Sequence, residues 1–322
     1  MSVNLTDPLN PPKPKLPKPT RLELPYRLCD VFTATPFQGN QLAVFEDAGD
    51  LTSDEMQRLA NETNLSETTF IVRREEAVER KEGIRVRIFT TQEELPFAGH
   101  PTLGTASTIR SFFPDYAGVE KIVLDLNVGK VPVRFSAAKS DGGATYGVMT
   151  QRKPAFGDLH DAAEAAAALG LGPHDLLATT PPQTVSTGLP YCVVPLGSIE
   201  VLGRLRIPQQ QAAAYLEGKG ARFFYCVAPV PGEKAMWRTR MQFYNGEDPA
   251  TGSAAGCAIS YLVAHGLAGS GEQVHLVQGV EIGRHSDLYV SAEKTNTGID
   301  QVLVGGSTVP VAKGHVFLER FT

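Results

Sequence analysis

The sequence lacks the features that would assign it to several common classes of protein. No apolar run approaches the roughly 18 residues that a membrane-spanning helix needs. The first residues include lysine and proline but no apolar core of a secretory signal. Neither sign of charge is in large excess, because the net charge is only −5. We therefore expect neither a membrane nor nucleic acid as the main partner.

Cysteine and histidine are few and scattered. The four cysteines form no C-x-x-C pair and lie in apolar or small-residue stretches, at Cys29, Cys192, Cys226 and Cys257. Such residues are typical of buried free thiols in a reducing compartment, so we expect a cytoplasmic protein. The seven histidines form no H-x-H or H-x-x-x-H pattern. No zinc site is expected, and the chain contains no nucleotide or flavin motif that would predict a cofactor.

The chain combines a globular composition with a proline-rich start. Its 322 residues are 42% hydrophobic and 20% charged, close to the globular average, and are enough for two domains. Residues 1–25 alternate proline with lysine, which favours polyproline II and buries too little apolar surface to fold alone. We interpret this segment as an arm. Its PxxP spacing leaves recognition by an SH3-type domain as the alternative.

From residue 26 onward, strand-like segments alternate with helical patterns and outnumber them. Each half contains one long helix of small residues, beginning near His100 and near Gly252. This pattern predicts an α+β fold with two domains of similar plan, 26–150 and 151–307, joined by a linker at 151–157. Near the end of the chain, three short strands are predicted, at 301–304, 309–312 and 316–319.

An internal repeat suggests an anion-binding site. Residues 96–100 and 249–253 both read Pro-x-x-Gly followed by His or Ser, and both run into a helix of small residues. The first N–H groups of a helix have no intrahelical partner, and the macrodipole adds partial positive charge. Two such ends facing each other could therefore bind one carboxylate. The alternative is that the glycines only allow tight turns, with His100 and Ser253 as N-caps.

Glu67 is the candidate acid–base group. It lies in the sequence LSETTF, immediately before a segment rich in Phe, Ile and Val. Apolar surroundings raise the pKa of a carboxyl toward the range useful for proton transfer. From these residues alone, a surface acid or one hydrogen-bonded to local backbone is the other interpretation.

Together, these segments resemble the phenazine biosynthesis PhzF-like family of the diaminopimelate epimerase-like fold. The resemblance extends from residue 26 to 314 and rests on six ordered motifs, at Asp30–Phe32 with Gly39-Asn40, Ser66–Phe70, Glu94–Thr105, Glu247–Gly256, Gln278-Gly279 and Gly283-Arg284. It implies two pseudo-symmetric domains, each a mixed sheet wrapped around a central helix, with the active site between them and usually a homodimer. It also implies that residues 308–322 return to the first domain.

The resemblance assigns roles to residues of both repeats. It implies that Glu67 is the catalytic acid/base and that three side chains assist it: His100, Asp248 and Ser253. The substrate-binding positions that it implies are Asn40, Gly99, His100, Thr251, Gly252 and Ser253. One departure matters, because epimerases of this fold use two cysteines as opposed acid and base. Here the corresponding positions are Ala98 and Thr251, so two-thiol racemisation is excluded.

These residues predict an isomerase that moves a proton on a small carboxylate without a cofactor or metal. Glu67 would remove the proton from one carbon and return it to another. A non-catalytic binding protein with the same fold is one alternative, favoured if Glu67 is exposed and more than about 8 Å from both helix starts, beyond hydrogen-bond reach. An amino-acid racemase that uses Glu67 and Asp248 on opposite substrate faces is the other.

Overall fold

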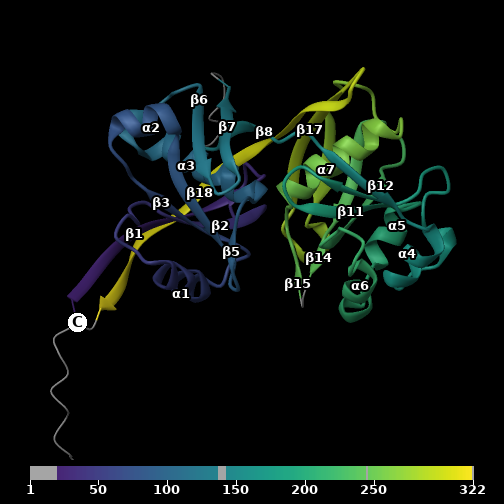
Figure 1. The fold of residues 1–322 in the computed structure, drawn as a ribbon, viewed down its shortest axis with the longest axis horizontal. Helices are drawn as coiled ribbons and strands as arrows, with labels where there is room; N and C mark the ends of the chain where they lie inside the picture. Colours follow the sequence, from purple (N-terminus) through teal and green to yellow (C-terminus); the bar gives the residue numbers. More distant parts are fainter. Residues whose placement is uncertain (1–19, 137–142, 244–245, 321–322) are drawn as a thin grey trace, which may run out of the picture.

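The protein consists of two halves side by side, each built around one long helix (Figure 1). The computed structural model describes residues 20–136, 143–243 and 246–320. The central helices are α3 (Gly99–Phe112) and α7 (Gly252–Ala264). The prediction of an α+β fold with one central helix in each half is confirmed. Within these described ranges, no helix is long and apolar enough to cross a membrane.

The strands of the first half form a closed barrel around α3. In spatial order they are β1 (Thr20–Val31), β2 (Asn40–Phe45), β3 (Thr68–Val72), β4 (Ile84–Phe89), β6 (Lys121–Leu126), β7 (Gly129–Phe135), β8 (Thr145–Thr150) and β18 (Gly298–Arg320), which pairs again with β1. The other elements of this half are α1 (Ser53–Thr63), α2 (Glu76–Glu82), β5 (Glu94–Leu95) and the 3-10 turn η1 (Pro114–Tyr116). Because the barrel encloses α3, all of its residues from 99 to 109 are buried.

The second half continues the same sheet around α7. From β18 the order is β17 (Ser286–Thr295), β16 (Val274–Gln278), β13 (Met236–Arg240), β12 (Phe223–Pro229), β11 (Pro190–Pro195), β10 (Gln183–Ser186) and β9 (Ala155–Leu159). Its outer elements are α4 (Ala162–Ala168), α5 (Ile199–Arg204), α6 (Gln209–Leu216), the hairpin β14 (Gln242–Phe243) and β15 (Gly246–Glu247), and the turns η2 (Pro173–Asp175) and η3 (Val280–Ile282). The predicted linker at 151–157 overlaps β9, which pairs with β10.

The three strands predicted near the end of the chain are one continuous strand, β18, which runs through both halves (yellow in Figure 1). Two glycines between the first and second of the predicted strands allow close packing within β18. A Cβ on Gly306 would lie 2.4 Å from the ring of Phe32, and one on Gly305 would lie 2.7 Å from the hydroxyl of Tyr146. Glycine within a strand often marks such an approach, so this prediction was wrong.

The start of β1 overlaps the predicted arm. Residues 20–25 pair with the last residues of β18, from Thr20 opposite Arg320 to Pro25 opposite His315. They are therefore strand residues of the first half, and residues 1–19 of the predicted arm lie outside the described residues. The pairing of β1 with β18 from Thr308 onward also places residues 308–320 beside the first half.

The two central helices meet at their first residues. A Cβ on Gly99 would lie 2.4 Å from the carbonyl carbon of Gly252 and 2.4 Å from the backbone nitrogen of Ser253. A Cβ on Gly252 would lie 2.9 Å from the ring of Phe32 and 3.1 Å from the carbonyl carbon of Gly99. Both glycines are thus required by close contact between backbones, and this contact sets the separation of the two halves.

We predict that Gly99→Ala destabilises the protein by about 1–3 kcal/mol, the usual cost of overpacking. The added methyl group must push the start of α7 away, because the atoms that it meets are backbone atoms that cannot rotate aside. Chemical denaturation would measure the loss. Gly49→Ala is the matched control, since a Cβ there has no neighbour within 4 Å. Equal stability of the two variants would contradict the contact.

Candidate active site

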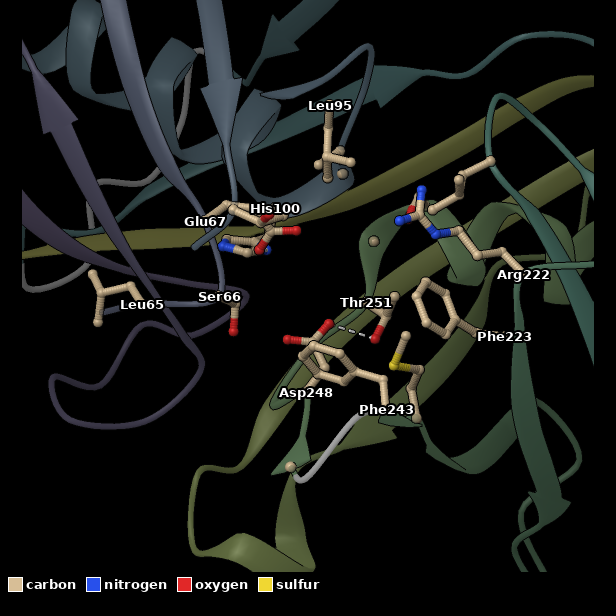
Figure 2. Close-up of a pocket in the computed structure, with 18 of the residues that line it drawn as sticks. Leu65, Ser66, Glu67, Leu95, His100, Arg222, Phe223, Phe243, Asp248 and Thr251 are labelled. Atoms are coloured by element: carbon tan, nitrogen blue, oxygen red, sulfur yellow. Dashed lines mark hydrogen bonds and ion pairs between the residues drawn. The ribbon is translucent and has the colours of Figure 1, made fainter. Parts of the chain in front are cut away.

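A cavity of about 690 Å³ lies between the halves, at the place where the two helices begin. Of the predicted residues besides Glu67, all but Asn40 line it: Gly99, His100, Asp248, Thr251, Gly252 and Ser253. Figure 2 shows Asp248 with Thr251 facing Glu67 and His100 from the other half. The structure therefore brings both repeats and Glu67 to one site.

The two helix starts have no side-chain caps. The N-cap positions are Ala98 and Thr251, and neither forms a side-chain hydrogen bond to the first turn of its helix within the described part of the chain. His100 and Ser253 are the second residues of their helices, so the N-cap interpretation was wrong. Because both starts line the cavity, their partial positive charges favour an anion there.

Glu67 is mostly buried beside the start of α3. Its side chain is 16% exposed, and Oε2 lies 3.7 Å from Nδ1 of His100. Among the described residues, Oε2 has no hydrogen-bond partner. Burial, and secondly the charge of Asp248, raise the pKa of Glu67 well above its usual value of 4.5. Glu67 thus lies close to a helix start and is not exposed, contrary to what the binding-protein alternative requires.

His100 is a neutral neighbour of this carboxyl. The residue is 2% exposed, and burial lowers the pKa of its imidazole to about 3. The contact with Glu67 is consequently not an ion pair at neutral pH. Nε2 of His100 is buried without a hydrogen-bond partner in the residues described. Oε2 of Glu67 and Nε2 of His100 are thus two buried polar atoms, in neighbouring residues, without a partner in the described part of the chain.

Asp248 is held by hydrogen bonds from both halves. Its Oδ1 accepts from Nδ2 of Asn40 at 2.6 Å, and its Oδ2 accepts from the hydroxyl of Thr251 at 2.6 Å. Nδ2 of Asn40 is also 2.9 Å from the carbonyl of Ala250 and 3.1 Å from Nδ1 of His100. Burial raises the pKa of Asp248 to about 6, although these hydrogen bonds oppose the rise. Asn40 thus connects Asp248 of the second half to His100 of the first.

Tyr191 and Gln278 hold the second repeat in place, and neither was among the predicted site residues. The hydroxyl of Tyr191 is 2.7 Å from Oγ of Ser253, and both residues are buried. Nε2 of Gln278 donates to the carbonyl of Asp248 at 2.8 Å and to the hydroxyl of Thr251 at 2.9 Å. A polar Gln at the end of the apolar segment VHLVQ was a signal for the second residue, whereas nothing local marks Tyr191.

The positions that carry cysteine in two-thiol epimerases lie at the cavity, as expected. Ala98 and Thr251 both line it. Cys257 does not, because it is buried further along α7, with Sγ 3.6 Å from the hydroxyl of Thr187. Among the described residues, no group of three His, Cys, Asp or Glu side chains could hold a metal ion.

Apolar side chains form the wall of the cavity opposite Glu67. Phe223 and Phe243 lie with their ring centroids 6.1 Å apart in an edge arrangement, and Figure 2 shows them on the side of Thr251. Leu65 and Leu95 line the cavity from the first half. A small ligand with a carboxylate and an apolar face fits this division into a polar floor and an apolar wall.

Known proteins resemble the chain over most of its length. The model of the family described as phenazine biosynthesis-like protein matches residues 29–314. Trans-2,3-dihydro-3-hydroxyanthranilate isomerase of Pseudomonas aeruginosa is 36% identical over 296 residues, covering 91% of this chain and 99% of the relative. Two solved structures, each covered to 99%, are also similar. One is a predicted epimerase from Pseudomonas aeruginosa, with 35% identity, 91% coverage of this chain and a TM-score of 0.76. The other is a PhzF-family phenazine biosynthesis protein from Bacillus anthracis. It has 25% sequence identity, covers 92% of this chain and has a TM-score of 0.79.

Three relatives that are 33% to 36% identical and cover 91% of this chain are named as isomerases. The protein is therefore an isomerase. The chain belongs to the phenazine biosynthesis-like protein family, as the sequence motifs indicated.

We predict that Glu67→Gln raises the melting temperature by a few degrees at pH 8. A carboxyl whose folded pKa is raised binds its proton more tightly in the folded state. The stability gained from this tighter proton binding is complete below the unfolded pKa of about 4.3. It is lost as the pH rises through the folded pKa of Glu67. Glutamine removes that loss, so the difference from the parent protein should vanish near pH 4. Scanning calorimetry at both pH values would measure it. The exposed Glu62→Gln is the control, and a lower melting temperature for Glu67→Gln at pH 8 would contradict the raised pKa.

Proposed function

We propose that the protein isomerises a small carboxylate by proton transfer through Glu67, without a cofactor. The observation that carries the proposal is a mostly buried carboxyl with a raised pKa and an unsatisfied oxygen beside two uncapped helix starts. A carboxyl with a raised pKa holds a proton more firmly than a free one, so it can both accept a proton and return it during a reaction.

The proposed reaction begins with the substrate carboxylate at the starts of α3 and α7. Their N–H groups stabilise the anion and the charge that develops next to it. Ionised Glu67 removes a proton from carbon, and the electron pair of the broken C–H bond moves into the conjugated system of the substrate. Protonated Glu67 then delivers the proton to another carbon of that system, which restores the carboxylate of the enzyme. No electrons are gained or lost overall.

The neighbouring residues have supporting roles in this proposal. His100 is neutral and lies next to Glu67, so it can position the substrate without competing for the proton. Asp248 is fixed by Asn40 and Thr251 and can accept a hydrogen bond from a substrate amino or hydroxyl group. Ser253 adds a hydroxyl at the start of α7. These residue roles come from their positions around the cavity and from the family motifs that they match.

Trans-2,3-dihydro-3-hydroxyanthranilate, named for the Pseudomonas aeruginosa relative, is the first substrate to test. It is a small ring carboxylate, and the apolar wall of the cavity suits such a ring. We also propose that the protein is a homodimer and that it is located in the cytoplasm. The free and buried cysteines support a reducing compartment, and the resemblance to the family supports the dimer.

The experiment is isomerisation in D₂O, followed by mass spectrometry. We expect the parent protein to convert the substrate and to introduce deuterium at the carbon that receives the proton. Glu67→Gln should slow turnover by about 10²–10⁴-fold, the usual contribution of a general acid–base group. The rate should rise with pH as Glu67 ionises. If the first substrate is not converted, a metabolite pool in D₂O extends the search. Full turnover by Glu67→Gln on any substrate would refute the proposal.

A further inference from the structure

The charges that line the cavity are unbalanced. Four acidic side chains line it, at Glu67, Glu93, Glu247 and Asp248. Among the described residues that line the cavity, Arg222 is the single arginine or lysine. A carboxylate substrate therefore meets acids of its own sign, and the helix starts and Arg222 are the groups that attract it.

Arg222 lies on the opposite side of the cavity from Glu67. It directly precedes β12, and its backbone N–H donates to the carbonyl of Pro190 at 3.0 Å, which anchors the chain at this point. Its side chain is 38% exposed. Figure 2 shows the guanidinium directed across the cavity toward the side of Leu95. The charge is thus accessible both to solvent and to a ligand that enters.

The guanidinium of Arg222 forms an ion pair with Glu93 of the first half. Glu93 directly precedes β5, and its side chain is 48% exposed. Exposed ion pairs contribute little to stability, so stability alone does not account for the placement of this pair at the cavity. The pair does affect the electrostatic potential of the cavity. The carboxylate of Glu93 opposes the positive charge of Arg222, which is the guanidinium that lines the cavity.

The other acids differ from Glu93 in their partners. Glu247 is paired with the buried Arg240, with Nε 2.8 Å from Oε1, and Arg240 does not line the cavity. Asp248 is bonded to Asn40 and Thr251. Glu93 is therefore the acid whose removal changes the field of Arg222 most directly.

We propose that Arg222 recruits the anionic substrate into the cavity and that Glu93 moderates this attraction. The inference rests on the proposed function in one respect, the negative charge of the ligand. A cleft with low-dielectric walls focuses the field of a charge and raises the local concentration of the opposite ion. Binding of the anion then competes with Glu93 for the guanidinium, so Arg222 acts on affinity and not on the proton transfer itself.

The test measures binding of anthranilate by titration calorimetry at low salt. Arg222→Gln should weaken binding about 10-fold, the low end of electrostatic focusing effects. Glu93→Gln should strengthen it, because one negative charge that opposes the field of the guanidinium is removed. Arg222→Lys should retain most of the affinity, since it keeps the charge. All these differences should shrink in 1 M salt, where the Debye length falls to about 3 Å.

Two controls separate recruitment from general effects. Aniline has the same ring and amino group but no carboxylate, so its binding should be the same in all variants. Arg204→Gln removes another exposed arginine of the second half, one that is ion-paired with Asp175 and does not line the cavity. It should bind anthranilate like the parent protein.

Opposite effects of the Arg222 and Glu93 substitutions on affinity would support the inference. If both substitutions weaken binding, the pair is a structural connection between the halves and the inference is wrong. It is also wrong if neither changes the affinity, or if the parent protein does not bind anthranilate. Binding is measured without turnover, so loss of the isomerase proposal in the D₂O experiment would leave a positive result here intact.

Discussion

The contact between Gly99 and Gly252 determines how the rest of the site is built. Each glycine begins a central helix, and there is no space for a Cβ at either position. Because the strands of the first half surround one helix and those of the second half surround the other, bringing the helix starts together also brings the halves together. The cavity lies at this junction, and its polar floor consists of the first residues of both helices.

The junction explains why the two acids have unusual proton affinities. Glu67 comes from the first half and Asp248 from the second, and each is removed from water by the approach of the other half. Burial is the main cause of the raised pKa of both carboxyls. Asp248 has hydrogen bonds from Asn40 and Thr251 that counter the effect of burial, whereas Oε2 of Glu67 lacks a partner within the described residues. The two acids are therefore suited to different tasks, one to holding a substrate and the other to carrying a proton.

Folding stability and activity make opposite demands on Glu67. A buried carboxyl without a partner disfavours the folded state once it ionises. Glutamine would relieve that cost but could not carry a proton. A residue that a stable core would exclude is common at functional sites, where local rules of packing give way to chemistry.

Much of this arrangement was predictable from local sequence. The Pro-x-x-Gly repeats marked the two helix starts, and hydrophobic patterning marked the α+β class, because both signals depend on residues close together in the chain. The family motifs then pointed to Glu67, His100, Asp248 and Ser253, which the structure brings to one cavity. The continuity of β18 was not predictable, since its glycines resemble turn signals until the side chains packed against them are known.

Only the tertiary structure decided the contacts between residues far apart in the chain. The ion pair of Glu93 with Arg222 and the hydrogen bond of Tyr191 with Ser253 join segments separated by 129 and 62 residues. The charge of Asp248, which is the second cause of the raised pKa of Glu67, likewise comes from the other half. The sequence by itself determined which side chains could carry a proton or hold an anion. Their proximity, their loss of water and the distances between them arise from the packing of the two halves, and no local pattern encodes that packing.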